Sequence, residues 1–183
     1  RRLLVLTARA VPTAGARPGP RRRHTAAAMT LPVDVRRLTP AHAAAYRRLM
    51  LAAYARHPEA FTSSAEERAA LPETWWEARL AEGPDASEVV FGAFVGDELA
   101  GTVGLLFEPR AKGRHKATLF GMMVDAAYRR HGLGAQLVAA ALDHARSLPR
   151  LLLVQLTVTD GNDGARAPYE RFGFQPWGGE PYA

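Results

Sequence analysis

Arg129, Gly132 and Gly134 form the pattern with the clearest chemistry in this sequence, Arg-x-x-Gly-x-Gly. It lies between a predicted strand and a predicted helix. Glycines at such a turn let the backbone approach a ligand without interference from a Cβ atom. The first N–H groups of a helix, and its partly positive end, favour an anion. With the two charges of Arg129 and Arg130, the pattern predicts a cradle for a phosphate or a pyrophosphate.

Two common nucleotide-binding patterns do not fit this loop. The Walker pattern needs Gly-Lys followed by Ser or Thr, and no such tripeptide occurs in the chain. The dinucleotide fingerprint needs a Gly or Ala three residues after Gly134, where this chain has Leu137. A tight turn that binds no ligand is the other interpretation of the two glycines.

Two segments together resemble a known family. Segment 124–134, VDAAYRRHGLG, is similar to the first signature of the GNAT N-acetyltransferases, Gln/Arg-x-x-Gly-x-Gly/Ala after a strand. Downstream, Asn162, Ala165 and the run YERFGF at 169–174 resemble the second signature. One predicted helix and one predicted strand separate the two signatures, as in that family. The resemblance covers roughly residues 33–178.

This resemblance implies an α/β fold: a mixed, mostly antiparallel sheet flanked by helices, with a V-shaped splay between the central parallel strands. It also implies acetyl-CoA as the co-substrate. The pyrophosphate would rest on backbone N–H groups of the glycine loop, and the pantetheine arm would lie in the splay. The residues that the resemblance assigns to acetyl-CoA are Met122, Val124, Arg129, Arg130, His131, Gly132, Leu133, Gly134, Ala135, Asn162 and Tyr169.

The implied reaction is acetyl transfer to a primary amine of a small molecule or peptide, by direct attack on the thioester. Tyr169 is the implied catalytic residue, since a phenol can give a proton to the departing thiolate. From the residues alone, Tyr169 could instead be a packed aromatic, and Asn162 a turn or cap residue. A non-catalytic acyl-CoA sensor and a transferase for another acyl group are the alternative functions. Four acidic residues are candidates for the general base by type only: Glu88, Glu98, Glu108 and Asp125.

The elements that must position these residues follow from apolar periodicity and turn residues. Strand 151–158 is almost wholly apolar, as expected for a strand buried on both faces. The order is β-α-α-β-β-β-α-β-α, without an internal repeat. The predicted elements are strand 33–38, helix 40–56, a broken helical stretch 65–82, a hairpin of 89–95 and 98–107, strand 116–125, helix 135–147, strand 151–158 and helix 163–172.

Residues 1–28 differ in composition from the rest. They contain seven Arg and no acidic residue, and their Pro and Gly break any helix, which predicts a disordered Arg/Ala/Pro-rich tail. The first Met is Met29, so the tail need not be native. We expect one N-acetyltransferase domain, 29–183, truncated at its C-terminus. The strand that the family places beside 151–158 has no room before Ala183, unless part of the N-terminal tail takes its position.

Charge and composition exclude several classes of protein. Seven of the 24 basic side chains lie in residues 1–28, so residues 29–183 hold 17 against 18 acidic ones, a net charge of −1. Such a domain lacks the basic surface of a nucleic-acid binder. No run approaches the roughly 18 apolar residues of a membrane span, and the lack of Cys excludes a thiol nucleophile. No His, Asp or Glu cluster has metal-ligand spacing. We therefore expect a cytoplasmic, bacterial protein, a monomer or homodimer, with no metal and no nucleic-acid or membrane partner.

Overall fold

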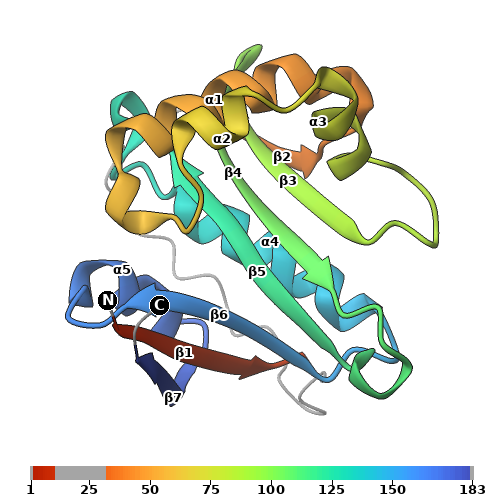
Figure 1. Cartoon of the computed structure of the whole chain (residues 1–183), viewed down its shortest axis with the longest axis vertical. Coiled ribbons are helices and arrows are strands. Elements are labelled where there is room, and N and C mark those ends of the chain that lie inside the picture. The colour runs from red at the N-terminus through yellow and green to blue at the C-terminus, as the bar shows by residue number, and fades with distance from the viewer. Residues whose placement is uncertain (1, 11–31, 182–183) are drawn as a thin grey trace.

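The computed structural model describes residues 2–10 and 32–181, which form a seven-stranded sheet with helices on both faces (Figure 1). The strand order is β2-β3-β4-β5-β6-β1-β7, and every neighbouring pair is antiparallel except β5 and β6. The predicted fold class is therefore confirmed.

The strands are β1 (Arg2–Arg9), β2 (Val33–Arg37), β3 (Glu88–Val95), β4 (Glu98–Phe107), β5 (Lys116–Val124), β6 (Leu153–Thr159) and β7 (Gln175–Pro181). The helices are α1 (Ala43–Arg56), α2 (Ala65–Ala69), α3 (Glu73–Arg79), α4 (Leu133–Ser147) and α5 (Asp163–Glu170), with 3₁₀ turns η1 (Pro40–His42), η2 (Pro58–Ala60), η3 (Ala111–Gly113) and η4 (Ala126–Tyr128).

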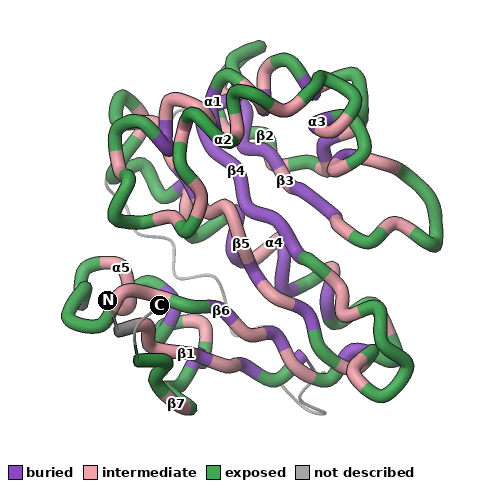
Figure 2. The backbone as a smooth tube through the Cα atoms, viewed as in Figure 1, coloured by how far each residue is buried: buried purple, intermediate pink, exposed green. Residues whose placement is uncertain are grey.

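Helices cover the two faces of β2–β5 separately. On one face, α1 and α3 bury Trp76 and Tyr46, whose rings meet edge to face with centroids 5.6 Å apart. On the other face, α4 packs Leu137 and Leu142 against β3 and β4. Buried residues follow β3 and β4 along most of their length (Figure 2), so these strands are the centre of the hydrophobic core.

The predicted splay is present between the two parallel strands. β5 pairs with β6 only where Lys116–Thr118 lie opposite Leu153–Gln155. Beyond that point the two strands diverge, which Figure 1 shows as a V. A bulge in β5 accompanies the divergence, because the register with β4 shifts where Gly121 and Met122 both lie opposite Val103.

The prediction that residues 1–28 form a disordered tail is wrong for residues 2–9, which form β1 at the centre of the second half of the sheet. β1 is antiparallel to β6 on one side and to β7 on the other, with Leu6 opposite both Leu156 and Pro176. Its side chains explain this position: Leu6 is fully buried and Ala8 and Ala10 are buried in the same core. Apolar residues at alternate positions outweigh the local excess of Arg. Residues 11–31 lie outside the described residues.

The expectation that the sheet lacks its last strand is also wrong. The edge of β6 that faces away from β5 is covered by β1, which is the alternative that the sequence left open. The chain also forms β7 after α5, at the outer edge of β1. We call β2–β5 the contiguous arm and β6, β1 and β7 the composite arm, since the latter joins segments from both ends of the described chain.

Candidate active site

The loop between β5 and α4 presents a row of unpaired backbone donors. Arg130 and Gly132 both have left-handed backbones, with φ of 69° and 79°. Gly132 is the N-cap of α4 and supplies no side-chain cap. In the part of the chain that the structure describes, the N–H groups of residues 130–135 have no hydrogen-bond acceptor. These donors and the helix end can hold an anionic group, as the glycine pattern predicts.

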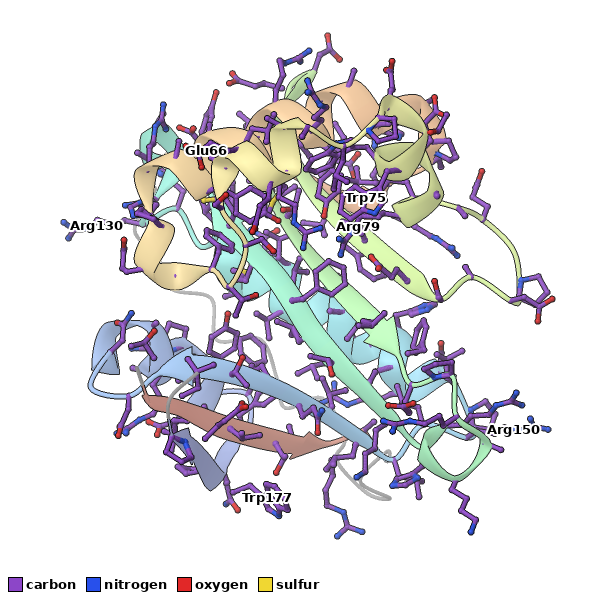
Figure 3. All side chains as sticks on the ribbon, viewed as in Figure 1. Glu66, Trp75, Arg79, Arg130, Arg150 and Trp177 are labelled. Atoms are coloured by element: carbon purple, nitrogen blue, oxygen red, sulfur yellow. The ribbon has the colours of Figure 1, made fainter. Side chains whose placement is uncertain are left out.

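The arginines of this loop point in different directions. The Arg129 guanidinium turns back toward α1, where it donates to His57 Nε2 at 2.9 Å and to the Val124 carbonyl at 3.4 Å. Arg130 extends away from the protein at the edge of the molecule in Figure 3. The His131 ring lies 2.9 Å from the Arg129 carbonyl through Nδ1 and is exposed. Arg130 is thus the arginine with a side chain free to move over the loop.

Packing explains the remaining residues of the loop. Leu133 is buried in the core and Ala135 is exposed, so each can reach an anion only through its backbone. A Cβ atom on Gly134 would lie 3.0 Å from Met122 Cε and 3.8 Å from Val124 Cγ2. Gly134 therefore lets α4 approach β5 closely. The Met122 and Val124 side chains lie on this α4 side.

The bulge in β5 is fixed from the opposite face of the sheet. Gly121 has a left-handed φ of 59°, and the buried Thr102 hydroxyl donates to its carbonyl at 3.1 Å. The Tyr46 hydroxyl lies 3.9 Å from the position that a Cβ on Gly121 would occupy. A bulge takes backbone groups out of the strand ladder. Gly121 and Met122 lie in the part of β5 that no longer pairs with β6.

Tyr169 and Asn162 both belong to α5, on the composite arm. Tyr169 is 9% exposed, and its ring packs edge to face on Phe174 with centroids 5.8 Å apart. This burial raises the pKa of Tyr169 to about 12. Asn162 is the N-cap of α5, where its Oδ1 accepts the Ala165 N–H at 3.1 Å. Tyr169 therefore packs in the core, and Asn162 caps α5. α5 begins at Asp163, where the sequence predicts a helix start, and continues through Pro168.

The four acidic candidates differ in their surroundings. Burial raises the pKa of Glu88, which pairs with Arg79 at 2.8 Å. The other three carboxylates lie at more exposed positions, and each has a hydrogen-bond or ion-pair partner. Glu98 accepts from the Tyr128 hydroxyl, Glu108 pairs with Arg110 so that its pKa falls to about 2, and Asp125 pairs with Arg56.

The sequence analysis missed a cluster of polar and aromatic side chains on the α1 face. Arg68 of α2 and Arg79 of α3 both lie over the Trp75 ring, at 4.8 and 4.7 Å from its centroid. Arg79 also lies 4.6 Å from the centroid of Phe120, the residue before the bulge. The i, i+4 spacing of Trp75 and Arg79 was the one signal available.

Segment 57–60, which follows α1, bridges the two arms. His57 contacts Arg129 in the glycine loop, and the Thr159 hydroxyl at the end of β6 donates to the Glu59 carbonyl at 3.4 Å. The segment between α1 and α2 thus lies across the open end of the splay.

Comparisons with known proteins agree with this arrangement. The family described as Acetyltransferase (GNAT) family matches residues 47–174. The chain is 28% identical over 109 residues to the L-amino acid N-acetyltransferase AaaT of Escherichia coli (strain K12). The match covers 59% of this chain and 65% of that protein, so the chain spans less than two thirds of the length of this relative. A GNAT-family acetyltransferase from Streptococcus pneumoniae superposes with a TM-score of 0.63 at 24% identity, covering 80% of this chain and 86% of that one. A predicted acetyltransferase from Clostridium acetobutylicum, solved with acetyl-CoA, superposes with a TM-score of 0.60 at 12% identity, covering 80% and 92%.

Two further observations concern the described residues. Within residues 2–10 and 32–181, no three His, Asp or Glu side chains lie where they could hold a metal ion. The helices of that same part of the chain are all too short or too polar to cross a membrane.

Proposed function

The chain belongs to the GNAT acetyltransferase family, and on that premise we propose that it transfers the acetyl group of acetyl-CoA to a primary amine of a small molecule or peptide. The observation that carries the proposal is the coincidence of two features at one end of β5. The strand ends in a loop of six unpaired N–H donors, and it leaves β6 after only three paired residues. The loop of donors can bind a pyrophosphate, and the neighbouring part of β5 that no longer pairs with β6 can bind an extended thioester arm.

The loop fits the anionic part of acetyl-CoA. The N–H groups of residues 130–135 would hold the pyrophosphate, with Arg130 free to lie against it. Arg129 would act through the loop backbone and through His57, to which it is bonded. Beyond Thr118, the β5 backbone would bond the pantetheine arm where it no longer pairs with β6.

Acetyl-CoA supplies an acetyl thioester, which a neutral amine can attack directly. The chain must then stabilise the negative charge that develops on the carbonyl oxygen. A backbone N–H in the bulge at Gly121 and Met122 is suited to this role, because a preorganised donor in a water-poor site is effective. The bond from Thr102 to the Gly121 carbonyl holds that backbone in place.

Tyr169 is proposed to hydrogen-bond the departing sulfur. With a pKa raised to about 12, its phenol keeps its proton at any ordinary working pH. The same shift makes it a weaker acid, so its contribution is a donated hydrogen bond at Oη as the sulfur gains charge. Asn162 would contact the cofactor arm through Nδ2, since its Oδ1 is used by the cap.

Calorimetry with acetyl-CoA, followed by thiol release in the presence of a panel of amines, tests this function. Binding with release on at least one primary amine supports it. Binding without release on any amine would favour the acyl-CoA sensor, and release only with another acyl-CoA would favour a different transferase. L-Amino acids belong in the panel, because the Escherichia coli relative is named for them. We also expect a cytoplasmic monomer or homodimer without nucleic-acid or membrane partners.

A further inference from the structure

Two arginines lie over one aromatic ring on the face of the sheet that carries α1. Arg68 and Arg79 both lie over Trp75, and Figure 3 shows Trp75 and Arg79 together between the helices and the strands. The Arg79 side chain is 15% exposed, and Arg68 is half-buried. The Nε atoms of both are buried and have no hydrogen-bond partner in the described chain. An unpaired buried donor is unfavourable, so this geometry favours a ligand that can accept from them.

The charges of this cluster do not balance. Arg79 pairs with Glu88 at 2.8 Å, whereas Arg68 donates to the neutral Ser63 hydroxyl at 2.7 Å. Arg68, Arg79 and Glu88 are the full charges that act on the neighbouring Tyr46 and Tyr54. Two guanidinium groups against one carboxylate leave one positive charge uncompensated, so a monoanion matches the cluster.

The cluster is next to the bulge proposed to hold the reacting carbonyl. The Phe120 ring, which lies under Arg79, occupies the space over Gly104 and directly precedes Gly121 in β5. Tyr46 connects the two places, because its hydroxyl lies near Gly121 and the charges of Arg68 and Arg79 act on the same phenol group. An acceptor amine at the bulge would therefore have the arginines beside the rest of its molecule.

We infer that Arg68 and Arg79 bind a carboxylate of the acceptor, so that the substrates are amines carrying a carboxylate, as amino acids do. This inference rests on the proposed function and adds the substrate class. The planar guanidinium fork suits a carboxylate, which can accept two parallel N–H bonds. Glu88 orients Arg79 by pairing with it, and Trp75 fixes the planes of both guanidinium groups. A phosphate dianion would reverse the charge of the cluster, so a carboxylate is the better match.

Acceptors that differ only in the carboxylate provide the test. Sets such as L-leucine, L-leucinamide and 3-methylbutylamine share the side chain, and kcat/KM is measured for each by thiol release. We expect the carboxylate member of at least one set to exceed its amide by at least about 100-fold, since sites built to bond a polar group reject analogues that lack it. Equal values for acid and amide in every set, or a preference for a phosphate-bearing amine such as phosphoethanolamine, would overturn the inference.

Variants assign the preference to these side chains. Arg68→Gln and Arg79→Gln should each remove most of the preference, measured as the ratio of kcat/KM for the acid to that for its amide, and Arg79→Lys should restore part of it. Arg36→Gln is the matched control, because Arg36 also lies over an aromatic ring, 4.2 Å from the Phe94 centroid, and pairs with Asp34. Retained preference in both Gln variants would overturn the assignment. Melting temperatures are compared, and Arg68→Gln leaves the Arg79–Glu88 pair intact should Arg79→Gln not fold.

A titration without turnover separates this inference from the proposed function. Trp75 fluorescence, defined as the difference from Trp75→Phe, should change saturably with L-leucine and much less with L-leucinamide. If some amine is acetylated but neither the rate nor the fluorescence distinguishes acid from amide, the inference fails while the proposed function stands. If acetyl-CoA does not bind and no amine is acetylated, the proposed function fails first.

Discussion

The two arms of the sheet meet over three paired residues and are built in different ways. In the contiguous arm, each strand pairs with the next one along residues 33–124, and helices cover both faces. In the composite arm, β1 from the start of the chain lies between β6 and β7. All but one of the residues of β7 are exposed, whereas most of β4 is buried.

This difference separates two kinds of functional residue. The glycine loop and the bulge belong to the contiguous arm and to its connection to α4, where local pairing holds them in place. Tyr169 and Asn162 belong to the composite arm, whose assembly requires both ends of the described chain to meet. Non-local pairing carries the larger entropy cost and forms late. We therefore expect cofactor anchoring to depend on the first arm and the position of Tyr169 on the second.

The largest expected effect is the loss of the composite arm in Leu6→Asp. Leu6 is fully buried between β6 and β7, and an unpaired carboxylate there costs several kcal/mol. Thermal unfolding should begin at a much lower temperature, and hydrogen exchange should rise first in β6. Arg9→Asp is the control on the exposed end of the same strand. An unchanged melting temperature in Leu6→Asp would show that β1 does not belong to the sheet.

The next effect concerns the contiguous arm. Gly134→Glu places a negative charge in the first turn of α4, beside the unpaired donors, and should weaken acetyl-CoA binding by more than about 100-fold. Gly134→Ala adds only the Cβ, whose nearest neighbour is the flexible end of Met122, so its affinity should stay within a few-fold of the parent. Calorimetry measures the acetyl-CoA affinity of both folded variants. Equal affinities would show that the pyrophosphate does not bind in this loop.

Tyr169→Phe should act on the chemical step alone. We expect kcat to fall by about 10²–10³-fold, the usual cost of losing one preorganised hydrogen-bond donor to a developing charge, with acetyl-CoA affinity nearly unchanged. The proposed hydrogen bond uses the protonated phenol, so a loss of activity from Tyr169 ionisation would appear only as pH rises toward its pKa of about 12. The kcat profiles of parent and variant should therefore run parallel from pH 6 to 10. A variant with parental kcat would show that Tyr169 only packs on Phe174.

The smallest expected effect comes from the bond that fixes the bulge. Thr102→Val removes the hydroxyl that donates to the Gly121 carbonyl, at a cost of about 1 kcal/mol in stability. We expect kcat to fall about tenfold if the bulge orients the donor to the carbonyl oxygen. Thr102→Ser keeps the hydroxyl and should retain most activity. Equal kcat in the Thr102→Val and Thr102→Ser variants would show that the bond that fixes the bulge does not contribute to catalysis.

The sequence predicts the contiguous arm better than the composite arm. The hairpin β3–β4, with its turn at Gly96-Asp97, and the loop ahead of α4 depend on neighbouring residues, and their predicted positions are confirmed. β1 was missed because Arg and Pro dominate the composition around a short apolar stretch, and only pairing with β6 and β7 makes that stretch a strand. Arg68 and Arg79 were missed for the same reason, since two separate helices bring them to one Trp ring.

Thiol release from acetyl-CoA, measured for the parent and Gly134→Glu side by side on the same amines, tests the central claim most directly. We expect amine-dependent release by the parent and loss of release by the variant at acetyl-CoA concentrations that saturate the parent. Raising the acetyl-CoA concentration should recover part of the variant's rate, because the change lies in the loop proposed to hold the pyrophosphate. A parent that releases no thiol with any primary amine would contradict the proposed acetyl transfer, and a variant as active as the parent would contradict the pyrophosphate site in the glycine loop.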